Sequence, residues 1–331
     1  MLKDIAKKQY VMGEKSMIET VVSIGLAVDE KMIIRKNRLQ PAELSGQEKR
    51  ICIVTGLHGD ELEGQYVCYE LIRKITKNME FLNGIVDVYP TLNPLGIDSV
   101  HRGMPTFDLD MNRIFPGSEN GAMAEHVAAK IIEDIEGADM CIDLHSSNIF
   151  LREIPQVRVS EHIAEKLVPY AKLLNIDLVW VHPVATVLES TLTYNLNNRN
   201  IPTLLVEMGV GMRITKGYGD QLVNGIFNLM KEMNIWKGEV STIKDAIVST
   251  EKEVEIINSK SSGIFMSTSN HLAEIKKGDS IGEIMNPLTG EMEEKVISPC
   301  DGMLFTLREY PVVYEGSLIA RVLGEIGRAH V

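Results

Sequence analysis

The chain has 331 residues, 44% of them hydrophobic and 24% charged, which is typical of a folded protein with one large domain or two unequal ones. Its 46 acidic residues outnumber 34 basic ones, and the net charge of -12 argues against nucleic acid or an anionic membrane surface as a partner. No apolar run approaches the ~18 residues that span a bilayer, and the N-terminal segment lacks the apolar core of a secretory signal, so we expect a cytoplasmic protein.

Short apolar runs alternate with segments of helical period between residues 50 and 235, and a possible β-hairpin at residues 17–40 precedes them. This alternation indicates strands linked through helices, so we predict an α/β fold with a mostly parallel sheet. The expected strands are 51–56, 85–90, 140–144, 177–181 and 203–207, and the expected helices are 61–76, 122–135, 161–174 and 218–233.

The sequence changes character after Trp236. A polar stretch is followed by short β-type runs separated by glycines, which predicts a smaller all-β domain at the C-terminal end. We place the boundary near residue 240, with a catalytic domain at residues 1–240 and a β-rich domain at residues 241–331.

Two histidines and one carboxylate are an established ligand set for catalytic zinc, which keeps a further position open for water. The segment GLHGDE supplies His58 and Glu61. The spacing of this pair does not decide the matter, because it occurs twice more in the chain. The other pairs are His162 with Glu165 and His271 with Glu274.

The surroundings of His58 favour it over His162. His58 follows the expected strand 51–56 in a turn flanked by Gly56 and Gly59, which allow the backbone to bend sharply. His162 falls in a segment of helical period, where a surface histidine is the simpler interpretation.

Two further reactive groups stand at the ends of expected strands. His145 follows strand 140–144, and Glu207 ends strand 203–207. Taken alone, His145 is more simply interpreted as a hydrogen-bonded core histidine, and Glu207 as an exposed acid at the end of a strand. Together with His58 they lie at the carboxyl ends of strands, where open α/β sheets bind ligands. Asp143 could hold the second ring nitrogen of His145.

The long segment at residues 91–117 shows little helical period but many polar groups, and a loop of this length in a compact domain is usually functional. Arg102 and Arg113 could bind a carboxylate, and Asn112 adds an amide donor. The alternative is a pair of surface arginines that balance the many acids.

Taken in order, GLHGDE, NP at 93–94, DLDMNRIFPG, DLHSS and VEMG resemble the succinylglutamate desuccinylase/aspartoacylase family, relatives of the carboxypeptidase A type of zinc peptidase. The resemblance implies a zinc-carboxypeptidase-like mixed, mostly parallel sheet flanked by helices. It implies one Zn²⁺ per chain on His58, Glu61 and His145, with Glu207 as general base and later acid.

The resemblance also implies roles for the long segment. Arg102 would polarise the scissile carbonyl, and Asn112 with Arg113 would bind a substrate carboxylate. The family arginine that reads a second carboxylate has no clear match, and Arg199 is near but poorly placed. The C-terminal domain resembles a lipoyl-type β-fold, but its NPLTGEM turn lacks a lysine for a carrier group, so we expect a structural cap over the cleft.

We therefore expect a zinc-dependent amidohydrolase that cleaves an N-acyl amino acid or a related small molecule and that could form a homo-oligomer. One alternative is a zinc metallocarboxypeptidase that acts on peptides. Another is a zinc-containing binding or scaffold protein without turnover, although a purely structural site would not need Glu207 and usually fills its fourth position.

Overall fold

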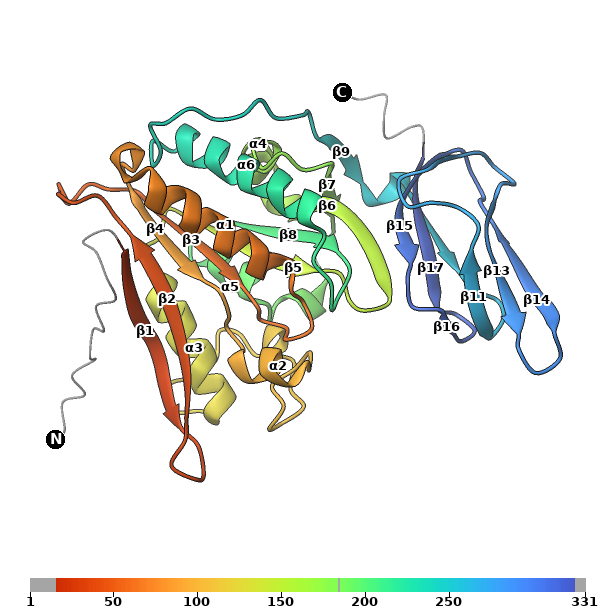
Figure 1. Cartoon of the computed structure of the whole chain (residues 1–331), viewed down its shortest axis with the longest axis horizontal. Helices are drawn as coiled ribbons and strands as arrows, with labels where there is room; N and C mark the ends of the chain where they lie inside the picture. The colour runs from red at the N-terminus through yellow and green to blue at the C-terminus, as the bar shows by residue number, and fades with distance from the viewer. Residues whose placement is uncertain (1–15, 184, 325–331) are drawn as a thin grey trace.

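The computed structural model of the chain describes residues 16–183 and 185–324. A mixed β-sheet runs through the molecule with helices on both faces, and a β-rich region follows at the C-terminal end (Figure 1). The predicted fold class is therefore confirmed. No helix in these ranges is long and apolar enough to cross a membrane.

The chain enters the sheet through a β-hairpin. Strands β1 (Ser16–Gly25) and β2 (Lys31–Leu39) pair antiparallel along their length, which confirms the hairpin predicted for residues 17–40. β2 also pairs antiparallel with β4 (Ile85–Tyr89), so the hairpin forms one edge of the sheet.

Parallel strands in the order β4, β3, β5, β8 form the centre of the sheet. Neighbouring residues of β3 pack into apolar clusters on opposite faces: Ile51 and Ile53 on one, Cys52 and Val54 on the other. A sheet buried on both faces needs almost continuously apolar strands, which explains why these runs stand out in the sequence. Their bounds are β3 (Arg50–Thr55), β4 (Ile85–Tyr89), β5 (Met140–Ser146) and β8 (Thr203–Gly209).

Helices α1, α4 and α6 contribute to the cluster on one face, and α3 and α5 to the cluster on the other (Figure 1). Two short helices, α2 and α5, were not predicted, because so few residues show no clear helical period. The helices are α1 (Glu63–Lys77), α2 (Pro94–Ser99), α3 (Met123–Ile135), α4 (Ala164–Lys172), α5 (Leu192–Asn198) and α6 (Lys216–Glu232). Short 3₁₀ turns cover Met79–Phe81, Met111–Arg113, Glu161–Ile163, Thr186–Leu188 and Glu251–Glu253.

Strand β6 (Leu151–Ser160) was missed by the sequence analysis, although it joins the two parts of the molecule. One edge of β6 pairs with β8. Along the other edge, the first residues of β6 pair with β15 (Gly302–Arg308) and the later residues pair with β7 (Leu178–His182). Pro155 lies where the pairing with β8 is irregular, and a proline within a run argues against a central strand.

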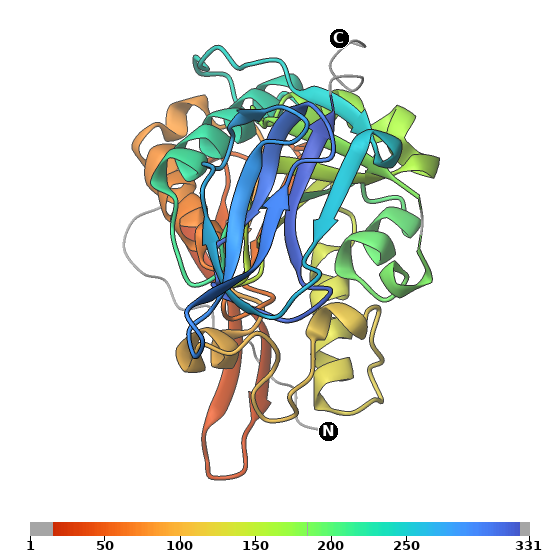
Figure 2. The ribbon, with the colours of Figure 1, turned by 90° about the vertical axis from the view of Figure 1, so that its right-hand side faces the viewer.

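The C-terminal region forms a second sheet, in the order β14, β13, β11, β16, and β15, β17 and β10 extend the main sheet beyond β6. Apolar residues of both sheets form one buried cluster, and in Figure 2 this region, in blue, faces the viewer. β9 (Ile247–Thr250) still belongs to the main sheet through β7, so the boundary near residue 240 stays a prediction. The remaining strands are β10 (Val254–Asn258), β11 (Gly263–Ser267), β12 (Glu274–Ile275), β13 (Ser280–Asn286), β14 (Glu291–Ile297), β15 (Gly302–Arg308), β16 (Val312–Val313) and β17 (Leu318–Gly324).

Candidate active site

The structure brings His58, Glu61 and His145 together at the carboxyl ends of β3 and β5. His58 and Glu61 lie in the turn between β3 and α1, and His145 lies near the end of β5. All three residues are buried, and one potential ligand atom from each lies within 4.8 Å of the others. The three ligands proposed from the sequence therefore form one cluster that could hold a metal ion.

Two glycines shape the turn that carries His58, each for a different reason. Gly56 has a φ of +62°, a left-handed conformation that favours glycine and turns the chain directly after β3. Gly59 makes a close approach instead, because a Cβ atom there would lie 2.0 Å from the carbonyl carbon of Gly96. The long segment is thereby packed directly against the turn.

The donor set of the cluster fits a catalytic zinc ion. His58 Nδ1 lies 2.7 Å from Glu61 Oε1, and His145 Nδ1 lies 2.8 Å from Glu61 Oε2. The two Nδ1 atoms are themselves 3.2 Å apart. Two imidazole nitrogens and one carboxylate that converge on a single point are a ligand set of zinc hydrolases.

The ring nitrogens on the opposite side of each histidine face carboxylates. His58 Nε2 lies 3.0 Å from Asp110 Oδ1, a hydrogen-bonding distance, and His145 Nε2 lies 3.2 Å from Asp143 Oδ1 without hydrogen-bond geometry. Carboxylates in these positions orient metal-binding histidines. Asp143 was considered from the sequence, whereas Asp110 was missed although it lies in the DLDMNR segment beside Asn112.

Arg102 lies against the cluster. Its Nη1 donates a 2.7 Å hydrogen bond to Glu61 Oε1, and its Nη2 is 3.9 Å from Asp110 Oδ2. The backbone amide of Gly59 donates to the Arg102 carbonyl, which anchors this part of the long segment to the turn that carries His58. A fixed cation therefore stands beside the candidate metal position.

Glu207 is the neighbour of His145 in the sheet, because the parallel register of β5 and β8 pairs the two residues. Burial raises the pKa of Glu207 to about 7, against the opposing effects of the Arg158 and His145 charges. The nearest cation is Arg158 on β6, whose Nη1 lies 3.7 Å from Glu207 Oε1. Arg158 was not identified from the sequence, because the strand that carries it, β6, was not predicted.

Asn112 and Arg113 differ in their exposure. Asn112 is buried, and its Oδ1 accepts a 2.9 Å hydrogen bond from the backbone amide of Leu192 at the start of α5. Arg113 is exposed, and its Nη1 donates to the carbonyl of Asn112 at 2.8 Å. Asn112 therefore ties the long segment to α5, while the Arg113 guanidinium remains accessible.

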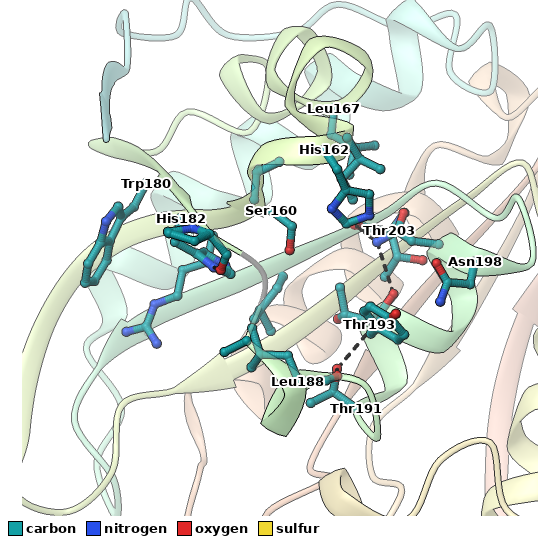
Figure 3. Close-up of a pocket in the computed structure, with 18 of the residues that line it drawn as sticks. Ser160, His162, Leu167, Trp180, His182, Leu188, Thr191, Thr193, Asn198 and Thr203 are labelled. Carbon is teal, nitrogen blue, oxygen red and sulfur yellow. Dashed lines mark hydrogen bonds between the residues drawn. The ribbon is translucent and has the colours of Figure 1, made fainter. Parts of the chain in front are cut away.

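A cavity of about 370 Å³ adjoins this site, and Asn112, Arg158 and Leu205 are among the residues that line it. Leu205 precedes Glu207 by two residues on β8, so the two side chains share one face of the sheet. Figure 3 shows Trp180 and His182 at one end of the cavity and Asn198 and Thr203 at the other. The cavity thus extends from the neighbourhood of Glu207 along the sheet and under α5.

The alternative histidines lie outside the His58, Glu61 and His145 cluster. His162 is exposed in the turn before α4 and lines the cavity, as expected of a surface residue. His271 lies in the C-terminal region, where its Nε2 is 2.9 Å from the carbonyl of Phe305. Arg199 caps α5 and lies 4.0 Å from Glu136.

Comparison with known proteins identifies a family from the sequence and a shared fold from the structure. The family model of the succinylglutamate desuccinylase/aspartoacylase catalytic domain matches residues 47–233, more than half of the chain. The N-alpha-acetyl-L-2,4-diaminobutyric acid deacetylase of Halomonas elongata is 28% identical over 113 residues, which cover 33% of this chain and 32% of that protein. The chain thus matches about a third of the length of that curated relative.

Solved structures resemble the chain over nearly its whole length. The product-bound ectoine utilization protein EutE (DoeB) of Ruegeria pomeroyi has a TM-score of 0.80 at 17% identity, covering 98% of this chain and 100% of that one. A succinylglutamate desuccinylase/aspartoacylase of Rhodobacter sphaeroides has a TM-score of 0.77 at 19% identity, covering 96% of this chain and 98% of that one. At such identities the likeness establishes the fold alone.

Proposed function

The chain belongs to the succinylglutamate desuccinylase/aspartoacylase family, and on this premise we propose that it is a zinc-dependent deacylase that hydrolyses the amide bond of an N-acyl amino acid. The observation that carries the proposal is the buried cluster of His58, Glu61 and His145 with Glu207 beside it in the sheet. The activity named for the Halomonas relative, deacetylation of an N-acetylated amino acid, supports the substrate class.

Each residue has a defined task in the proposed reaction. Zinc held by the cluster would supply Lewis acidity, which polarises a carbonyl oxygen and lowers the pKa of a bound water to about 7. Glu207 accepts a proton from the attacking water and returns it to the leaving amine. Arg102 stabilises the negative charge that develops on the carbonyl oxygen. The products are a carboxylic acid and a free amino compound.

The remaining residues would orient the substrate. Asn112 and Arg113 would bind the carboxylate next to the scissile amide, and the cavity would receive a substituent of the substrate. The burial of Glu207 raises the pKa of its carboxyl group, and a general base works best when its pKa is close to the working pH.

A substrate panel tests this function against its alternatives. The purified full chain, supplied with one equivalent of zinc, should release free amine from N-acyl amino acids faster than it removes C-terminal residues from N-blocked peptides. The reverse preference would make it a carboxypeptidase. Zinc binding without turnover of either substrate set would leave the scaffold alternative.

A free carboxylate beside the scissile amide should be required for efficient turnover. A charge-assisted hydrogen bond contributes about 1.5–3 kcal/mol, so replacing that carboxylate by a neutral amide should lower kcat/KM by roughly 10 to 10²-fold. The Arg113→Ala variant should lose most of this preference. The measurement is a double cycle in which both enzymes are assayed on the acid and on its neutral amide.

The Arg199→Ala variant is the matched control, because it removes another accessible arginine that caps the end of α5 rather than lying in the long segment. It should retain the preference for the acid. Equal discrimination by wild type and Arg113→Ala would show that Arg113 is an ordinary surface arginine.

A further inference from the structure

Glu153 on β6 is a buried carboxylate shared by two arginines from different parts of the chain. Its side chain is 2% exposed. Glu153 Oε2 accepts hydrogen bonds from Arg158 Nη2 at 2.7 Å and from Gln156 Nε2 at 2.6 Å. Glu153 Oε1 accepts a hydrogen bond from Arg321 Nη1 at 2.6 Å. Arg321 lies on β17 of the C-terminal region, so this carboxylate joins that region to the α/β part.

The register of the sheet fixes this arrangement. Thr306 on β15 lies opposite both Glu153 on β6 and Arg321 on β17, so the three residues form one row across the strands. Both guanidinium groups also lie against the ring of Trp180, with Cζ at 5.5 Å from the ring centroid for Arg158 and 5.4 Å for Arg321. The two arginines therefore share a carboxylate and an aromatic ring.

Beyond Glu153 and Trp180, the two arginines have different neighbours. Arg158 lines the cavity, and its Nη1 is 3.7 Å from Glu207 Oε1. Arg321 is not among the residues that line the cavity in the described part of the chain. The hydrogen bond and the ring contact of Arg321 therefore reach Arg158 through Glu153 and Trp180, while its charge acts on Glu207 from farther away.

We propose that Arg321 is a positioning residue for the active site, and this inference rests on the proposed function for the role of Glu207. By occupying Glu153 Oε1, Arg321 leaves Arg158 a single hydrogen bond to Oε2, and Arg158 Nη1 stays directed toward Glu207. Arginine often binds a carboxylate through two parallel hydrogen bonds when both oxygens are available. Without Arg321, the buried Oε1 loses its donor, and Arg158 turns to take both oxygens and withdraws from Glu207.

Variants of both arginines test the proposal. Arg321→Met should lower kcat/KM about 10-fold, and Arg321→Lys should recover most of the loss because its ammonium group can also donate to Oε1. In an Arg158→Met background, Arg321→Met should cause no further loss. Multiplying losses in the double variant would show that Arg321 acts independently of Arg158 and would overturn the proposal.

The Glu309→Gln variant is the matched control. It breaks the ion pair between Arg152 on β6 and Glu309, which also joins the C-terminal region to the α/β part but does not reach the cavity. It should leave kcat and KM unchanged. If Glu309→Gln lowered kcat/KM as much as Arg321→Met, any weakening of the contact between the C-terminal region and the α/β part would explain the loss, and the proposal would be overturned.

A crystal structure of the Arg321→Met protein gives a readout that does not depend on the substrate. We expect the Arg158 guanidinium to bind both oxygens of Glu153 and to lie farther from Glu207 than 3.7 Å. An unmoved Arg158 overturns the proposal even if the enzyme is a deacylase. A wild type that is inactive on every N-acyl amino acid overturns the proposed function instead, and the position of Arg158 still decides whether Arg321 places it.

Discussion

The Glu207→Gln variant is expected to keep its fold and its metal and to lose roughly 10²-fold or more in kcat, because an amide cannot accept and return a proton. Glu207 is not part of the cluster of potential metal ligands, although the sheet register places it beside His145. Metal content and turnover of the purified variant are the two measurements. Near-normal kcat would remove Glu207 from the reaction, and loss of the metal would make it a ligand.

The pH profile provides a second test of Glu207. Burial raises the pKa of this carboxyl to about 7, and only its ionised form accepts a proton. The wild-type kcat/KM should therefore fall as the pH drops through that pKa, and a bound divalent cation would move the fall to lower pH. The fall should be absent in the Glu207→Gln variant. Glu165→Gln, at an exposed acid of a second HxxE pair, should leave both kcat and the profile unchanged.

The central strands and the candidate ligands could be predicted for one physical reason. Strands buried on both faces must be apolar throughout, so β3, β5 and β8 are visible in the sequence, and polar residues at their ends stand out. His58, His145 and Glu207 occupy such places, and parallel strands bring their carboxyl ends to one edge.

The residues that were missed depend on contacts between distant segments. Asp110 faces His58 only because the long segment folds back over the turn at Gly59, and this approach leaves no periodic pattern. β6 is polar in part and contains Pro155, so neither Glu153 nor Arg158 could be assigned to the site. Arg321 joins them through a register that spans three strands, which a single sequence does not encode in any local feature.

The His58→Ala and His145→Ala variants are expected to purify without zinc, whereas the wild type should carry about one zinc per chain. Each substitution leaves only two of the three anchors that a catalytic zinc site needs, and activity should fall with the metal. Elemental analysis gives the ratio of zinc to protein, and circular dichroism shows whether each variant is folded.

Two further variants make this result specific. His162→Ala should keep its zinc, because His162 is exposed and lies outside the cluster. Asp110→Asn should weaken zinc binding by roughly 10 to 10²-fold without abolishing it, because Asp110 orients the imidazole of His58 but is not itself in the cluster. If His162→Ala loses zinc while His58→Ala keeps it, the metal is held by a different HxxE pair, and the site at the ends of β3 and β5 is wrong.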